Sequence, residues 1–282
     1  MTNTSSEAAE AHAAPPEAWD AIADGYDRYV APREAEVAGE ALRLVGLAPG
    51  ERFLDVAAGT GGLSLPAAHI GAEVLATDWS PAMIDRFTAR AREQGLSKAE
   101  VRVMDCHALD LPNDAFDVAG SQFGVMLVPD QARALREMVR VTKPAGRVVV
   151  IAYGAPGELE FLQVFIAALQ AVAPDFPGLP DDPPPLEFQV SDPAVLHRRL
   201  TEAGLRHVRV ERTVERPAFR SGQEMWDWVL YGNPIPGMLV ADLSNAQRAR
   251  LLEMLDRTVR ERADGTGLAH LANAINIGIG TK

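Results

Sequence analysis

Glycines and carboxylates stand close together early in the chain, between two apolar stretches. Leu54-Asp55-Val56-Ala57-Ala58-Gly59-Thr60-Gly61-Gly62 follows the first stretch, and the second stretch ends at Asp78. The order predicts a strand, a glycine-rich turn, the start of a helix, and a second strand with an acid at its tip. Glycines in such a turn expose backbone N–H groups to a polar tail, and a carboxylate can accept hydrogen bonds from ribose hydroxyls. The segment therefore predicts a nucleotide site.

Two classes of protein use such a turn. Dinucleotide-binding oxidoreductases carry G-x-G-x-x-G, but Ser64 stands where the third glycine would be, and that fingerprint has no acid at Asp55. The segment resembles instead the first motif of the class I methyltransferases that use S-adenosylmethionine, with an acid before the glycines and another after the next strand. Ala57 replaces the first glycine of that motif. Because alanine does not adopt positive φ cheaply, a slightly altered turn is expected.

The resemblance implies roles for individual residues. Asp78 would accept hydrogen bonds from both ribose hydroxyls, and Asp105, after the third strand, would bind the adenine amino group. Trp79 would lie against the adenine or simply pack. Asp55 would either orient the turn through backbone N–H groups or lie near the sulfonium. The implied cofactor site comprises Tyr26, Asp55, Ala57, Gly59, Gly61, Asp78, Trp79, Met83, Asp105, Cys106 and Gln122.

A second resemblance lies nearer the N-terminus. The segment from Trp19 to Tyr29 reads WDAIADGYDRY, and it is similar to the N-terminal segment of small-molecule methyltransferases related to the ubiquinone and menaquinone C-methylating enzymes. In that family a tyrosine reaches the cofactor carboxylate region, and Tyr26 is the match. The alternative interpretation is an amphipathic helix packed by Trp19, Ile22 and Tyr26.

Methyl transfer from a sulfonium depends mainly on proximity and alignment, and a general base matters only if the acceptor must lose a proton. His107 is the candidate base, because it follows a strand that ends in the predicted site. Aromatic side chains of the second half suit a small, largely apolar acceptor, or equally a buried core. The candidate acceptor residues are Phe123, Tyr153, Phe161, Phe165, Trp226 and Tyr231.

Amino-methylating DNA enzymes carry Asp/Asn-Pro-Pro-aromatic after the fourth strand. This chain has Ser121-Gln122-Phe123-Gly124 at that place. Asn233-Pro234-Ile235-Pro236 resembles that motif only in its letters, and no role is expected for it. The net charge of −12 also disfavours nucleic acid as acceptor. The expected partner is therefore a small organic molecule.

Composition limits the other classes. The chain has 282 residues with 47% hydrophobic content, enough for a globular core, and no apolar run reaches the roughly 18 residues of a membrane span. The single cysteine, Cys106, excludes an internal disulfide, and the histidines show no ligand spacing, so no metal is expected. The default location is the cytosol, and the preference for arginine over lysine suggests a GC-rich bacterial genome.

Strand and helix patterns alternate up to Ala152, which predicts a doubly wound, Rossmann-like α/β fold. The resemblance implies a seven-stranded sheet, mostly parallel with an antiparallel last strand, and an inserted helical cap over the carboxyl ends of the strands. We expect a disordered tail over 1–16, a cofactor-binding core over 17–153, and completion of the sheet with the acceptor cap over 154–282. The predicted activity is methyl transfer from S-adenosylmethionine, leaving S-adenosylhomocysteine. A non-methylating relative that binds the same cofactor and a nicotinamide oxidoreductase are the alternatives.

Overall fold

A computed structural model describes residues 14–282, so the expected tail over 1–16 lies outside the described residues except for its last three. The chain forms a seven-stranded sheet in the order β3-β2-β1-β4-β5-β9-β6. All neighbouring strands are parallel except where β9 pairs with β5 and β6. The expected fold class is confirmed. The strands are β1 (Arg52–Val56), β2 (Glu73–Asp78), β3 (Ala99–Val103), β4 (Phe116–Gln122), β5 (Thr142–Tyr153), β6 (Arg206–Glu215) and β9 (Asn273–Thr281).

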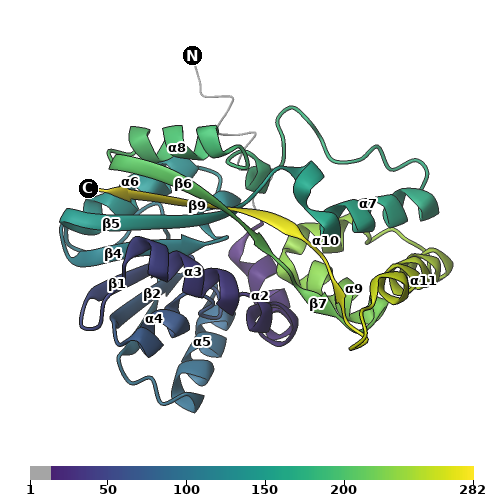
Figure 1. The fold of residues 1–282 in the computed structure, drawn as a ribbon, viewed down its shortest axis with the longest axis horizontal. Coiled ribbons are helices and arrows are strands. Elements are labelled where there is room, and N and C mark those ends of the chain that lie inside the picture. Colours follow the sequence, from purple (N-terminus) through teal and green to yellow (C-terminus); the bar gives the residue numbers. More distant parts are fainter. Residues whose placement is uncertain (1–13) are drawn as a thin grey trace.

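Helices cover both faces of this sheet. Figure 1 shows α6 and α8 on one face, and α3, α4 and α5 on the other. Within the described part of the chain, no helix is both long and apolar enough to cross a membrane. The helices around the sheet are α2 (Pro16–Gly25), α3 (Ala35–Val45), α4 (Ser64–Ile70), α5 (Pro81–Glu93), α6 (Gln131–Val141) and α8 (Pro193–Glu202).

The helix that follows β2 begins where its capping residues predict. The Ser80 hydroxyl accepts a hydrogen bond from the Met83 N–H, and Pro81 occupies the first helical position. The Asp192 carboxylate caps α8 in the same way, and Gly204 follows that helix with φ +105°. Local sequence therefore fixes these helix ends close to the site.

Three segments differ from the expected elements. The sequence over 17–47 predicts a helix, but the structure divides this segment into α2, a π-helical turn at Tyr26–Val30, a 3-10 turn at Ala31–Arg33, and α3, because Pro32 cannot donate a helical hydrogen bond. The sequence Lys143-Pro144-Ala145-Gly146 predicts a stop before the fifth strand, but β5 starts at Thr142 and bulges within that stretch, where Ala145 has φ +62°. A small sheet of β7 (Ala218–Phe219) and β8 (Ala269–His270), and the helix α10 (Pro234–Leu239), were not predicted.

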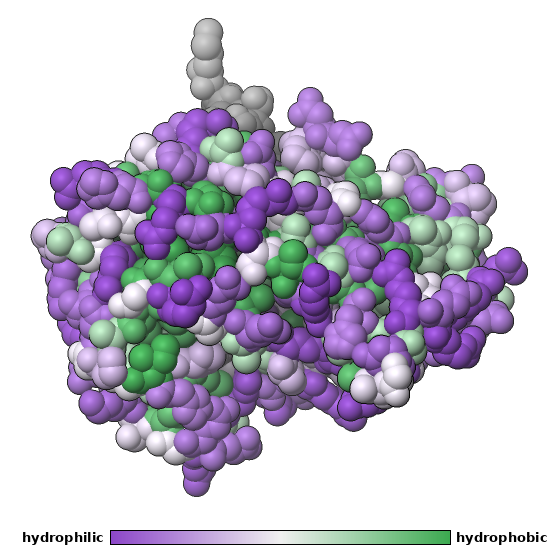
Figure 2. Space-filling view, in the orientation of Figure 1, coloured by the Kyte–Doolittle hydropathy of each residue, from purple (hydrophilic) through white to green (hydrophobic). Residues whose placement is uncertain are grey.

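The cap is assembled from two separate stretches rather than one insertion. Its helices are α7 (Glu160–Val172), before β6, and α9 (Gly222–Gly232), α10 and α11 (Asn245–Arg262), after it. They share an apolar core that includes Phe165, Trp228 and Leu255. Figure 2 shows hydrophilic residues over the outward side of α11, at the lower right of the view. The cap therefore has a core of its own beside the sheet.

Candidate functional site

The glycine turn after β1 has the backbone that its glycines allow. Gly59 and Gly61 adopt φ of +53° and +96°. A Cβ at Gly61 would stand 2.7 Å from the Phe87 ring, so only glycine fits there. Ala57 also takes a positive φ, +54°. The alanine therefore adopts the left-handed conformation itself, at a cost of roughly 1–2 kcal/mol.

Asp78, at the tip of β2, is tied to that turn. One carboxylate oxygen accepts the Gly59 N–H at 2.8 Å, and the other accepts the Ser80 N–H at 2.9 Å. The side chain is buried at 8% exposure, and this burial raises the pKa of its carboxyl group. Each oxygen keeps further acceptor capacity, because a carboxylate has about four acceptor sites.

Asp55 is fully buried at the end of β1. Its Oδ2 accepts the Ser64 hydroxyl at 2.6 Å, while its Oδ1 has no partner among residues 14–282. Burial raises the pKa of this carboxyl to about 7. Its side-chain contact is thus with the first residue of α4.

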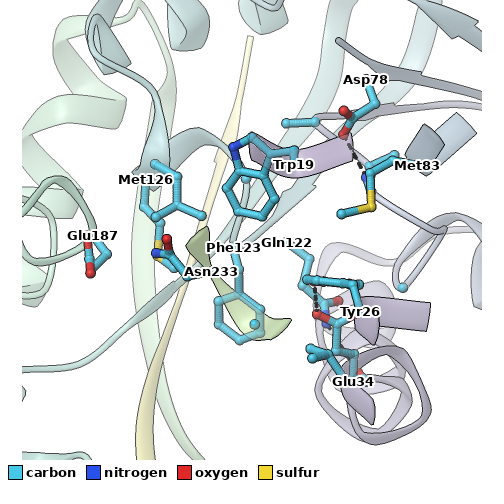
Figure 3. Close-up of a pocket in the computed structure, with 18 of the residues that line it drawn as sticks. Trp19, Tyr26, Glu34, Asp78, Met83, Gln122, Phe123, Met126, Glu187 and Asn233 are labelled. Carbon is cyan, nitrogen blue, oxygen red and sulfur yellow. Dashed lines mark hydrogen bonds between the residues drawn. The ribbon is translucent and has the colours of Figure 1, made fainter. Parts of the chain in front are cut away.

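A cavity of about 1440 Å³, part of it open to solvent, lies between the sheet and the cap. In Figure 3, Asp78 and Glu187 lie on opposite sides of it, with Trp19 between them. The predicted residues that line it are Tyr26, Asp55, Ala57, Gly59, Asp78, Trp79, Met83, Cys106, His107, Gln122, Phe123, Tyr153 and Phe161. Gly61, Asp105, Phe165, Trp226 and Tyr231 do not line it in the structure.

Tyr26 faces a glutamate that sequence reasoning missed. Its hydroxyl donates to Glu34 Oε1 at 2.5 Å (Figure 3), and the amide of Gln122 donates to the Glu34 backbone carbonyl at 3.2 Å. Glu34 is only 6% exposed, and burial raises the pKa of its carboxyl to about 7. A Cβ at Gly62 would clash with this carboxylate, so the pair lies against the glycine turn.

The Asp105 side chain does not line the cavity as expected, and it contacts His107 instead. Its carboxylate lies 2.7 Å from His107 Nδ1 and accepts the His107 backbone N–H at 2.8 Å. The other ring nitrogen, Nε2, is buried without a partner among the described residues. Cys106 lies between them, and burial raises the pKa of its thiol to about 12. One ligand atom from each of the three lies within 4.8 Å of the others.

Aromatic rings form one wall of the cavity. Phe123 stacks on Tyr153 at 4.6 Å between ring centroids, Tyr153 lies 5.8 Å from Phe161, and Phe161 meets Trp228 edge-on at 4.9 Å. We call these four rings the aromatic wall. Trp228, one of the aromatic residues of the second half, lines the cavity in place of the expected Trp226.

Phe165, Trp226 and Tyr231 were expected to contact the acceptor, but they do not line the cavity. Phe165 and Trp226 pack on each other inside the cap at 6.3 Å, and Tyr231 stacks on Tyr29 at 5.5 Å. These rings face neighbouring helices because α9 packs on its other sides against the N-terminal segment and α11. They hold the cap together.

The segment Asn233-Pro234-Ile235-Pro236, for which no role was expected, contributes to the cavity. Asn233 and Pro236 line it, and Asn233 also caps α10 by accepting the Ile235 N–H at 3.0 Å. Glu187, which the sequence did not single out, and Trp19, which was expected only as a packing residue, also line the cavity. Their positions depend on how distant segments pack, so no local pattern signals them.

The lining residues fit a cationic nucleoside such as S-adenosylmethionine. Buried acceptor atoms without partners among residues 14–282 include Asp55 Oδ1 and Gln122 Oε1. The cavity lining includes Glu34, Asp55, Asp78 and Glu187, and neither a lysine nor an arginine among the described residues. The glycine turn leaves space beside Asp78 for a close approach of the ligand.

Comparison with known proteins agrees with this geometry. Residues 54–150 match the family model described as a methyltransferase domain. The chain is 38% identical over 130 residues to the demethylmenaquinone methyltransferase of Renibacterium salmoninarum, covering 46% of this chain and 53% of that protein. It is 41% identical over 140 residues to an uncharacterized protein of Mycobacterium bovis, covering 50% and 48%. The chain thus spans about half the length of the curated relatives it matches.

Solved structures share the fold over most of the chain. The YcgJ protein of Bacillus subtilis has a TM-score of 0.56 at 17% identity, covering 87% of this chain and 97% of that one. A phosphoethanolamine N-methyltransferase of Haemonchus contortus, solved with S-adenosyl-L-methionine, has a TM-score of 0.55 at 17% identity, covering 88% and 52%. Residues 54–150 of the chain therefore resemble a methyltransferase domain, and the fold of the chain is one that methyltransferases of known structure share.

Proposed function

We propose that the protein transfers the methyl group of S-adenosylmethionine to a small organic acceptor. One observation carries the proposal: a single cavity joins the glycine turn and Asp78 to the aromatic wall under the cap. A cofactor at the turn and an acceptor at the wall would share one enclosed space. Enclosure and alignment are what an in-line methyl transfer needs most from a protein.

The residue roles follow from this arrangement. Asp78 would hold the ribose hydroxyls, and Trp79, Met83 and Cys106 would surround the adenine. Tyr26 and Gln122 would bind the methionine end, together with Glu34. The Asp105 carboxylate lies outside the cavity lining, so its expected contact with the adenine amino group would need its side chain to turn away from His107.

His107 would act as a base for a hydroxyl acceptor, which must lose a proton. The Asp105 carboxylate at Nδ1 favours the tautomer with its proton on that nitrogen, which leaves Nε2 as an acceptor. Asp105 is then a positioning residue for the ring. The role applies only to a proton-losing acceptor, because displacement at a sulfonium does not itself require a base.

The test is titration calorimetry with S-adenosylhomocysteine and, separately, with NAD, followed by turnover with labelled cofactor and a metabolite panel.

Asp78→Ala should weaken S-adenosylhomocysteine binding at least about tenfold, because hydrogen bonds to a charged group contribute about 1.5–3 kcal/mol each. Asp85→Ala, an exposed acid of α5, is the control and should bind normally. Preference for NAD, or normal binding by a folded Asp78→Ala protein, would overturn the cofactor assignment. Binding without turnover of any acceptor would favour a non-methylating relative.

A further inference from the structure

The cap end of the cavity combines aromatic rings with carboxyl groups. The aromatic wall of Phe123, Tyr153, Phe161 and Trp228 lies on one side, and Glu187 comes from a 3-10 turn at Leu186–Phe188. Glu187 and Asp78 lie on opposite sides of the close-up (Figure 3). Glu187 therefore lies across the cavity from Asp78, where the ribose is proposed to bind.

Glu187 lacks a partner for one of its oxygens. Its Oε2 is buried and accepts no hydrogen bond from residues 14–282, and burial raises the pKa of the carboxyl. Asp55 also keeps one unpartnered oxygen, Oδ1, but its Oδ2 accepts the Ser64 hydroxyl. Glu34 accepts the Tyr26 hydroxyl, and Asp78 accepts the N–H groups of Gly59 and Ser80. An unpaired buried carboxylate costs several kcal/mol, so a ligand that brings a donor or a positive charge would relieve that cost.

The wider charge pattern points the same way. Burial raises the pKa of the Tyr153 hydroxyl, and the negative charges of Glu215, Glu34 and Glu187 raise it further. These three carboxyl groups therefore make the electrostatic potential at the aromatic wall more negative. No lysine or arginine lines the cavity among the described residues to oppose them. An anionic acceptor would meet several carboxyl groups there and no lysine or arginine of the described residues. A cation would meet carboxyl groups and ring faces, and both attract positive charge.

We propose that the acceptor is an apolar amine, whose nitrogen rests against the aromatic wall and pairs with Glu187. The proposal rests on the proposed methyl transfer and names its substrate class. Aromatic faces bind ammonium groups through the ring quadrupole, most strongly when the site excludes water. The remaining lining, including Met126, Leu162 and Pro236, is apolar and suits the rest of such a molecule.

The chemistry balances for such an acceptor. A bound ammonium gives its proton to the Glu187 carboxylate, which leaves a neutral nitrogen with a lone pair. That lone pair forms the new N–C bond, while the bond between the methyl carbon and the sulfonium sulfur breaks and its electron pair stays on sulfur. The positive charge passes from sulfur to nitrogen, so the product is a methylated ammonium beside the neutral Glu187 and a neutral thioether.

The test uses three compounds that share a benzyl group and carry a cationic, a neutral or an anionic substituent on it. Benzyltrimethylammonium is the cation, neopentylbenzene replaces its nitrogen with carbon, and phenylacetate is an anion on the same ring. Each is titrated into the protein with and without saturating S-adenosylhomocysteine. We expect the cation to bind at least about tenfold more tightly than the neutral isostere, which corresponds to about 1.4 kcal/mol, and phenylacetate to bind most weakly.

Two variants tie that preference to the site. Glu187→Gln and Phe161→Leu should each reduce the ratio of cation to isostere affinity at least about threefold, while S-adenosylhomocysteine affinity and melting temperature stay close to wild type. Asp181→Asn removes an exposed carboxylate from the segment that leads to Glu187, and it should leave the ratio unchanged.

Equal affinity for cation and isostere, or a ratio insensitive to Glu187→Gln, would overturn the amine proposal, as would turnover of a phenol or hydroquinone in preference to its amine analogue. Failure of S-adenosylhomocysteine to bind would overturn the proposed function instead. The free protein would still report on the ammonium site in that case, so the two failures are distinguishable.

Discussion

At the scale of single residues, Ser64 both argues against a dinucleotide-binding turn and supports the buried carboxyl group of Asp55. Ser64 stands where a dinucleotide-binding turn would have its third glycine, and its hydroxyl supplies the side-chain donor to Asp55, at 2.6 Å. Asp55 is fully buried and its Oδ1 has no partner within residues 14–282. The hydrogen bonds from Ser64 favour the charged form of Asp55, and they therefore offset part of the free energy that is lost when this carboxyl group is buried.

Ser64→Ala tests this contact. Removing the hydroxyl should lower the free energy of unfolding by about 1–3 kcal/mol, the range for a buried group that loses its partner. The loss should be larger at pH 8 than at pH 6, because the hydrogen bond favours the charged form of Asp55, whose pKa burial raises to about 7. Urea unfolding at both pH values measures it. Thr88→Ala, on the exposed side of α5, is the control, and an equal loss at the two pH values would contradict the idea.

At the scale of elements, the cap depends on close helix contacts. A Cβ at Gly222, the first residue of α9, would stand 2.2 Å from the backbone nitrogen of Asp256 in α11. The Gly222 N–H also donates to the Asp256 carboxylate at 3.0 Å. Because the opposing atoms belong to a helix backbone, they cannot move aside as a side chain could. The glycine therefore sets the distance between these two cap helices.

Gly222→Ala should destabilise the protein by about 1–3 kcal/mol, as expected for overpacking of a close contact. Gly39→Ala is the matched control, since a Cβ at this exposed helical glycine of α3 meets nothing within 4 Å. That substitution should instead stabilise the protein by about 0.5–1 kcal/mol through helix propensity. Thermal unfolding of the two variants side by side gives the comparison. Similar shifts in both would show that α9 and α11 are not held at this distance.

The sequence predicted the features that depend on neighbouring residues, but not those that depend on how distant elements pack. The glycine turn, Asp78 and the caps at Ser80 and Asp192 were predictable, because each depends on residues next to it in the chain. Which aromatic residues of the cap line the cavity could not be predicted in this way. Trp226 and Trp228 lie two positions apart on α9, so they point to nearly opposite sides of the helix, and only its packing decides that Trp228 lines the cavity. Glu187 and Asn233 reach the same cavity from irregular segments, which carry no periodicity to read.

At the scale of the whole molecule, several buried carboxyls make stability depend on pH. Burial raises the pKa of Glu34, Asp55 and Glu215 to about 7 each, whereas an unfolded chain has values near about 4. The folded state therefore binds more protons than the unfolded state between these limits. Stability should fall as pH rises from about 4 through 7, and then level off.

Glu215 is the one of these three groups that does not line the cavity. The substitution Glu215→Gln therefore tests its contribution to the pH dependence alone. Its carboxylate accepts the Asn273 amide at 3.0 Å and is 6% exposed. The variant should reduce the fall in unfolding free energy between pH 5 and 8 by about 1–3 kcal/mol, and it should be the more stable protein at pH 8. Denaturant titrations at three pH values measure this slope. Glu211→Gln, exposed on the same strand, should leave the slope unchanged, and an unchanged slope in Glu215→Gln would refute the assignment.

The position of β9 also constrains the order in which the molecule can fold. β6 pairs in the sheet only with β9, and β9 is the strand that joins it to β5. During synthesis, all the other strands of the sheet leave the ribosome before residues 273–281 do. Until then β6 has no neighbour, and β5 presents an unpaired edge along Arg147–Tyr153. The nascent chain must therefore hold an open apolar sheet edge for the time taken to translate about 120 residues, roughly 6–24 s at about 5–20 residues per second, and this is the interval in which chaperones would protect it.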